Sequence, residues 1–137
     1  MLRPPRRVHL HQLLTSDLVP GYQDACCWAL DYDEVRAEKV RAAYTRGEIR
    51  DFYDLHLLAA AGVDMESDDF IALVDAKLAE VKQAPIRDQS TAFGLTAARR
   101  AAVRASGKGL AAVVRLDEPD FDLDAVIAHY ERLWGKV

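Results

Sequence analysis

The 137-residue sequence lacks the features of a membrane-spanning, secreted or disulfide-bonded protein. Its only two cysteines, Cys26 and Cys27, are adjacent and make no disulfide framework, so a reducing cytoplasm is the expected compartment. No apolar run approaches the roughly 18 residues of a membrane span, and no signal-peptide apolar core follows the basic start. We therefore expect no membrane partner, and the net charge of −4 points to no class of partner either.

The sequence also lacks a convincing metal or phosphate-loop motif. The Ser106–Gly109 segment has neither the spacing of a phosphate-binding loop nor a strand before it. His9 and His11 have no identifiable third ligand, so we expect packing or surface histidines. The Asp-x-Asp pairs at Asp31 and in 120–124 are better explained as acids at helix starts, where the helix dipole favours them. We predict no metal site in this chain.

Five segments have the periodicity and end signals of helices, so the expected fold is mainly α in a single domain, residues 1–137. The predicted helices are Tyr32–Arg46, Ile49–Ala61, one capped by Ser67 and stopped by Pro85, one from Thr96 to about Ala105, and Phe121–Trp134. One or two short strands are expected near the N-terminus, at Ala25–Leu30 and, as a strand or a helical turn, at Val8–Leu14. A lone strand needs a sheet to join, which hints at a missing portion or a partner chain; a homo-oligomer through an exposed strand or helical face is one such arrangement.

The first two predicted helices flank a turn at Gly47 and should form an antiparallel hairpin. Lys39 and Asp54 lie about 10–12 Å from the turn, one on each helix, at the same level. One face of the hairpin would then present Lys39 and Arg46 opposite Asp51 and Asp54. On periodicity alone the favoured interpretation is that these are paired or solvated charges without a catalytic role.

The hairpin sequence also resembles a known family, on a run of residues with shared spacing. The run is Glu34, Glu38-Lys39-Val40-Arg41-Ala42, Arg46, and Arg50-Asp51-Phe52-Tyr53-Asp54-Leu55. It is similar to the signature of the AbiEii/AbiGii nucleotidyltransferase toxins, which belong to abortive-infection toxin–antitoxin systems. The resemblance is strong over residues 25–60 and looser through the later helices.

The resemblance implies a toxin that transfers a nucleotide from an NTP to RNA or protein and has an antitoxin partner. It implies that Lys39, with Arg46, contacts nucleotide phosphates and that Asp51 or Asp54 assists the transfer. Mg²⁺ and NTP are implied for the complete family enzyme. The family's early Gly-rich loop and Asp-x-Asp carboxylates are missing here, so we expect the N-terminal catalytic lobe to be absent and no cofactor in this chain.

Two explanations of that absence stay open: a truncated or excised piece of the enzyme, or a stand-alone helical module that binds a partner protein or RNA without catalysis. Both predict no nucleotidyl transfer by the isolated chain, and they leave open whether the chain is an enzyme at all. The basic residues Arg99, Arg100 and Arg104 are candidates for weak RNA binding, because phosphate contacts dominate nucleic-acid affinity. The alternative is that this basic helix pairs with the acidic segment that begins after Leu116.

Overall fold

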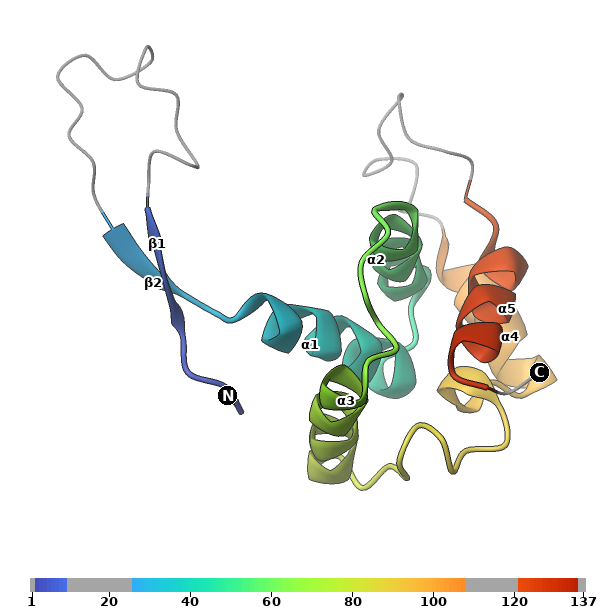
Figure 1. Ribbon diagram of the computed structural model, residues 1–137. Helices are drawn as coiled ribbons and strands as arrows, with labels where there is room; N and C mark the ends of the chain where they lie inside the picture. Colours follow the sequence, from blue (N-terminus) through green and yellow to red (C-terminus); the bar gives the residue numbers. More distant parts are fainter. Residues whose placement is uncertain (1, 10–25, 108–120, 136–137) are drawn as a thin grey trace, which may run out of the picture.

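The computed structural model describes residues 2–9, 26–107 and 121–135, which form a mainly helical fold (Figure 1). The elements in this part of the chain are the strands β1 (Arg6–His9) and β2 (Cys26–Ala29), and the helices α1 (Tyr32–Thr45), α2 (Ile49–Ala60), α3 (Asp68–Glu80), α4 (Ala97–Ala105) and α5 (Leu123–Leu133), with a 3-10 helix η3 (Ala92–Gly94) before α4. The prediction of a mainly α fold is confirmed. No helix in the described ranges is long and apolar enough to cross a membrane.

The two strands form a small antiparallel sheet that lies at the α1 end of the molecule in Figure 1. Arg6 lies opposite Ala29, and His9 lies opposite Cys26. Strand β2 falls inside the segment predicted at Ala25–Leu30. Strand β1 begins before the predicted Val8–Leu14 segment, most of which lies outside the described residues.

Helices α1 and α2 form the predicted hairpin, with Gly47 in the turn at a φ of +64°. A side chain at Gly47 would meet the Arg99 guanidinium at 3.0 Å, so both the backbone angle and the space favour glycine. Asp31 caps α1 by accepting hydrogen bonds from the backbone N–H groups of Asp33 and Glu34. Glu34, three residues after Asp31 as in a capping box, does not close that box, because its carboxylate instead accepts from the N–H groups of Leu2 and Arg3.

The later helices begin where polar side chains satisfy free backbone N–H groups. The Ser67 hydroxyl accepts from Phe70 N at 3.3 Å, and the Thr96 hydroxyl accepts from Arg99 N at 3.2 Å, as predicted. Helix α5 begins at Leu123, two residues later than expected, because Asp122 is its cap and accepts from Asp124 N at 2.9 Å. The acid at Asp122 is therefore explained by helix capping.

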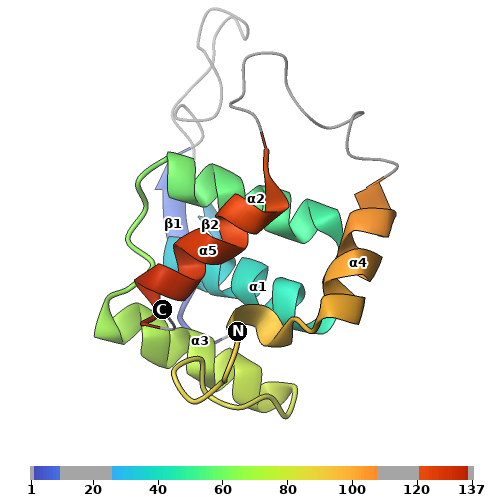
Figure 2. The same cartoon turned by 90° about the vertical axis from the view of Figure 1, so that its right-hand side faces the viewer.

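The core lies between α1, α2, α3 and α5, and η3 inserts an aromatic ring at its centre. Figure 2 shows α5 in front of α1 and α2, with α4 beside them. The ring of Phe93 is fully buried, with centroids 5.2 Å from Tyr44, 5.2 Å from Phe52, 5.9 Å from Tyr130 and 5.3 Å from Trp134. These aromatic contacts join four separate segments of the chain and hold the hairpin against α5.

Candidate functional site

Lys39 of α1 and Asp54 of α2 face each other across the hairpin. The Lys39 Nζ lies 2.8 Å from Asp54 Oδ2, and the two side chains are 44% and 37% exposed. The expected meeting of Lys39 with an acid of the second helix is therefore seen. The roles of both residues in phosphate binding and transfer stay predictions.

The Lys39–Asp54 pair lines a hollow of about 190 Å³ between the two helices. The hollow is lined by Val35, Arg36, Lys39, Asp54, Leu57 and Leu58. Three of these residues are aliphatic and three are charged. An ammonium group has three N–H donors, and Asp54 is the one partner of Lys39 among the described residues. Two donors of Lys39 therefore remain for a ligand.

Arg46 and Asp51 form a second, separate pair at the turn end of the hairpin. Arg46 Nε lies 3.1 Å from Asp51 Oδ2, and Arg46 Nη2 contacts Asp51 Oδ1 more closely. The hydrogen bond and the charge of Asp51 raise the pKa of Arg46. The carboxylate of Asp51 is buried and also accepts from Glu48 N at 2.9 Å, which caps α2.

The four predicted site residues thus fall into two pairs rather than one cluster. The carboxylate of Asp51 is occupied by Arg46 and by the helix start, and Asp51 does not line the hollow. Asp54 is half-exposed and does line it. The sequence left open which aspartate matters, and of the two only Asp54 lines the hollow.

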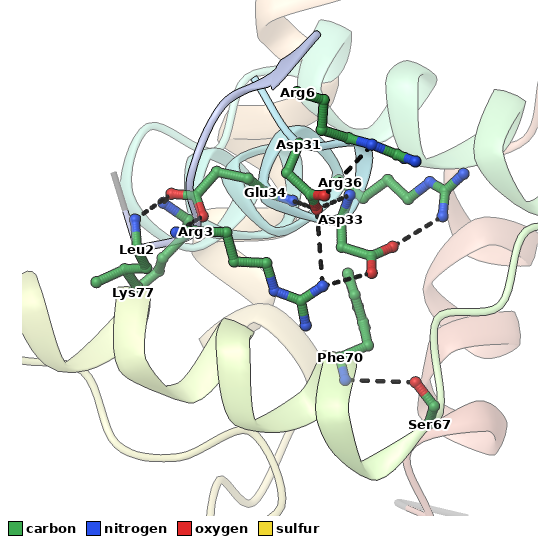
Figure 3. A network of polar contacts seen from close by, with 10 residues as sticks. All are labelled: Leu2, Arg3, Arg6, Asp31, Asp33, Glu34, Arg36, Ser67, Phe70 and Lys77. Atoms are coloured by element: carbon green, nitrogen blue, oxygen red, sulfur yellow. Dashed lines mark hydrogen bonds and ion pairs between the residues drawn. The ribbon is translucent and has the colours of Figure 1, made fainter. Parts of the chain in front are cut away.

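A buried ionic network behind the hairpin was not predicted from the sequence (Figure 3). Lys77 of α3 lies 2.6 Å from a carboxylate oxygen of Glu34 and 2.6 Å from one of Glu38, and the side chains of Lys77 and Glu34 are only 2% and 1% exposed. Glu34 also accepts from Leu2 N at 2.7 Å and from Arg3 N at 2.8 Å. The network therefore ties α1 to α3 and to the N-terminal segment.

Ion pairs at the start of α1 extend this attachment, as Figure 3 shows. Arg3 Nη1 lies 2.7 Å from Asp33 Oδ2 and 3.6 Å from Asp31 Oδ1, and Arg36 Nη1 lies 3.0 Å from Asp33 Oδ1. The Arg6 guanidinium lies 5.0 Å from the ring centre of Tyr32. The carboxylates of the Asp31-x-Asp33 motif are thus engaged with the helix start and with arginines.

The network makes the fold less stable at low pH. Burial raises the pKa of Glu34, but hydrogen bonds from Lys77 and from the Leu2 and Arg3 backbone outweigh burial and lower the pKa from its usual 4.5 to about 2. A carboxyl with a depressed folded-state pKa stabilises the fold above its unfolded pKa, and that contribution is lost as pH falls through the folded value.

We expect the free energy of unfolding to fall by about 3 kcal/mol, from this group alone, as pH drops from about 4.5 towards 2. Urea midpoints measured across this range would show the loss. A Glu34→Gln variant should start less stable at neutral pH and show a shallower slope. An equal slope for the variant and the parent would contradict the assignment to Glu34.

The three arginines proposed for RNA binding all contact the protein itself. Arg99 donates to the carbonyl oxygens at the end of α1, to Tyr44 O by a short bond and to Ala43 O at 3.4 Å. Arg100 lies 3.2 Å from Asp124, and Arg104 contacts the same carboxylate. For Arg100 and Arg104 the structure shows the predicted alternative, pairing with the acidic segment. RNA binding by these residues stays a prediction.

Among the residues that the structure describes, no group of three His, Cys, Asp or Glu side chains is placed to hold a metal ion. His11, Asp120 and the Lys108–Gly109 part of the glycine segment lie outside the described ranges. The expectation of no metal site in this chain therefore stays a prediction.

Comparison with known proteins decides the lineage. A sequence model of the family described as nucleotidyl transferase AbiEii toxin, type IV toxin–antitoxin system, matches residues 1–129. The chain belongs to the AbiEii family. No curated protein and no solved structure matches it. Membership in a toxin–antitoxin family implies an antitoxin partner in general terms.

Proposed function

We propose that this AbiEii-family chain contributes a phosphate-binding site to nucleotidyl transfer from an NTP to RNA or protein, in a toxin–antitoxin system. The observation that carries the proposal is the Lys39–Asp54 pair, which spans the hairpin and lines a hollow. Lys39 binds nucleotide phosphate, and Asp54 is the carboxylate beside it. Arg46 is a second cation, and Asp51 holds it at the turn.

The chemistry of the pair supports this assignment. A lysine ammonium is a compact point charge with rotatable donors, which suits a polyphosphate. An aspartate in this position would orient or deprotonate an attacking hydroxyl once the phosphate has drawn the ammonium towards itself. Because Asp54 pairs with Lys39, the ammonium and the carboxylate lie side by side at the hollow.

The family also implies Mg²⁺ and NTP, and the described residues do not fit the metal. The carboxylate of Asp54 faces an ammonium, and that of Asp51 faces a guanidinium and a backbone N–H. No third metal-ligand side chain joins either one within the described ranges. We therefore derive no metal-dependent step from this chain, and the isolated chain is expected to show no transfer.

Binding of ATP without metal, measured by isothermal titration, tests the proposal. Lys39→Ala is expected to weaken binding about tenfold, because a charge-assisted contact to phosphate is lost. Arg87→Ala is a matched control that removes one cation from an exposed pair with Asp68 on α3, and it should leave the affinity unchanged.

Both variants should remain folded, because exposed ion pairs contribute only about 0–1 kcal/mol to stability. A loss of ATP affinity therefore reports on binding and not on unfolding. Equal ATP affinities for the parent chain and the Lys39→Ala variant would overturn the proposal. That result would favour a non-enzymatic helical module that binds a protein or RNA.

A further inference from the structure

A second hollow, of about 370 Å³, lies between α2 and α5 and has no role in the proposed function. It is lined by His56, Ala59, Ala60, Asp122, Ala125, Val126, His129 and Arg132. These residues follow helical spacing along one face of each helix. The Lys39 hollow uses other residues of α2, namely Asp54, Leu57 and Leu58, so the two sites are separate.

Two buried polar atoms of α2 have no hydrogen-bond partner among the described residues. They are Nε2 of His56, a residue that lines the hollow, and the hydroxyl of Tyr53, which lies one turn earlier and is not among the lining residues. The two rings stack with centroids 6.2 Å apart. Buried polar groups in folded proteins are nearly always satisfied by protein, water or a ligand. The hollow therefore has unused capacity to bind a polar group.

The polar groups that remain available at this hollow are the Arg132 guanidinium, which only donates, and the His129 imidazole, whose nitrogens can donate or accept. Arg132 has no ion pair among the described residues, and neither ring nitrogen of His129 has a hydrogen bond there. The acid that lines the hollow, Asp122, is used as the cap of α5. The next acid along, Asp124, is shared by Arg100 and Arg104. Asp122 keeps its negative charge as a cap, so Arg132, which has no ion pair among the described residues, is the charged group of the lining that would contact an anion.

An aromatic surface adjoins these donors. Phe121 stands edge-on to Tyr53 at 5.7 Å and to His56 at 5.6 Å between centroids. Phe121 and His56 are partly exposed, so their rings offer a surface on which a base can stack. The volume falls within the range of small-molecule sites and exceeds the size of a phosphate ion alone.

We propose that the α2–α5 hollow binds a nucleoside phosphate, with the phosphate on Arg132, His129 and His56 and the base against the Phe121–His56 aromatic surface. The phosphate belongs either to a free mononucleotide or to the backbone of single-stranded RNA. In either case the site is independent of Lys39.

Imidazole signals provide a direct readout, because the chain has only four histidines. Long-range proton–nitrogen NMR spectra of the full chain would be recorded during titration with inorganic phosphate, AMP and a short single-stranded oligoadenylate. We expect the signals of His56 and His129, assigned by His→Gln variants, to shift together with AMP. Inorganic phosphate should act more weakly, because it lacks a base to stack.

Arg132→Gln is expected to weaken AMP binding about tenfold, because it removes a charged donor on the protein surface. Arg87→Gln is the matched control and should not change it. Lys39→Ala should also leave it unchanged, which separates this site from the proposed triphosphate site. Tighter binding of oligoadenylate than of AMP identifies RNA as the source of the phosphate, and the reverse order identifies a free nucleotide.

Three results would overturn the proposal. The first is that neither His56 nor His129 shifts with any of the three probes. The second is that both shift equally in the parent and in Arg132→Gln. The third is that phosphate and AMP bind with equal affinity, which would leave an anion contact without nucleoside recognition.

Discussion

Replacing Lys77 with alanine is expected to lower the free energy of unfolding by about 3–5 kcal/mol, the cost of removing one partner of a buried ion pair. The change would leave the carboxylate of Glu34 at 1% exposure without its cation and would also take a hydrogen-bond donor from Glu38. Burial lowers the pKa of Lys77, but its bonds to the two glutamates outweigh burial and raise it, so the amine is charged at neutral pH. Urea unfolding at pH 7 measures the effect.

Two further variants separate the ionic role of Lys77 from its packing. Arg87→Ala breaks an exposed pair with Asp68 and should cost at most about 1 kcal/mol. The double variant Lys77→Met with Glu34→Gln removes both charges at similar volume and should recover much of the lost stability. A loss below about 1 kcal/mol for Lys77→Ala would show that the network contributes little.

Replacing Phe93 with alanine is expected to cost about 3–5 kcal/mol, because it opens a cavity at the meeting point of the aromatic core. The ring contacts α1, α2 and α5 through Tyr44, Phe52, Tyr130 and Trp134. The backbone at Phe93 has a φ of 60°, a strained angle for any residue with a Cβ, and alanine does not relieve it. The cost is therefore the lost packing, and thermal or urea unfolding would measure it.

Leu30→Ala is a suitable comparison for Phe93→Ala, because Leu30 is an apolar residue whose side chain is exposed. Its substitution should change stability by no more than about 0.5 kcal/mol. If Phe93→Ala cost no more than Leu30→Ala, the centre of the core would lie elsewhere.

The parts of the fold that could be predicted from sequence depend on local signals. The hairpin turns at Gly47, and the caps Asp31, Ser67 and Thr96 act within three residues of themselves. The pairing of Lys39 with Asp54 also follows from local rules, because a short turn brings positions equally far from it to the same level.

Features that depend on contacts far apart in sequence could not be predicted in this way. Glu34 and Lys77 are 43 residues apart, and nothing near Glu34 shows that it turns away from its own helix start. Arg99 reaches Tyr44 across 55 residues and satisfies carbonyls at the end of α1. One signal was present: Lys77 lies on the apolar stripe of α3, one turn after Val74, where an exposed lysine is not expected.

The same limit applies to the candidate site. The sequence placed Lys39, Arg46, Asp51 and Asp54 on one face, and the structure resolves them into two pairs with different surroundings. The burial of Asp51 depends on the cap of α2 and on the Arg46 side chain, so periodicity alone could not rank the two aspartates. The hollow beside Asp54 forms only when both helices are packed together.

The central claim is that Lys39 is the phosphate ligand and Asp54 its carboxylate neighbour. Its most direct test is to measure the affinity of two single variants for inorganic tripolyphosphate. Lys39→Ala should bind about tenfold more weakly than the parent. Asp54→Asn should bind as tightly or more tightly. The variant removes a negative charge whose repulsion of the bound phosphate costs roughly 1 kcal/mol. The exposed ion pair with Asp54 contributes little to holding Lys39 in place. If both variants lost affinity equally, the pair would be structural support for the hairpin, and the claim would be contradicted.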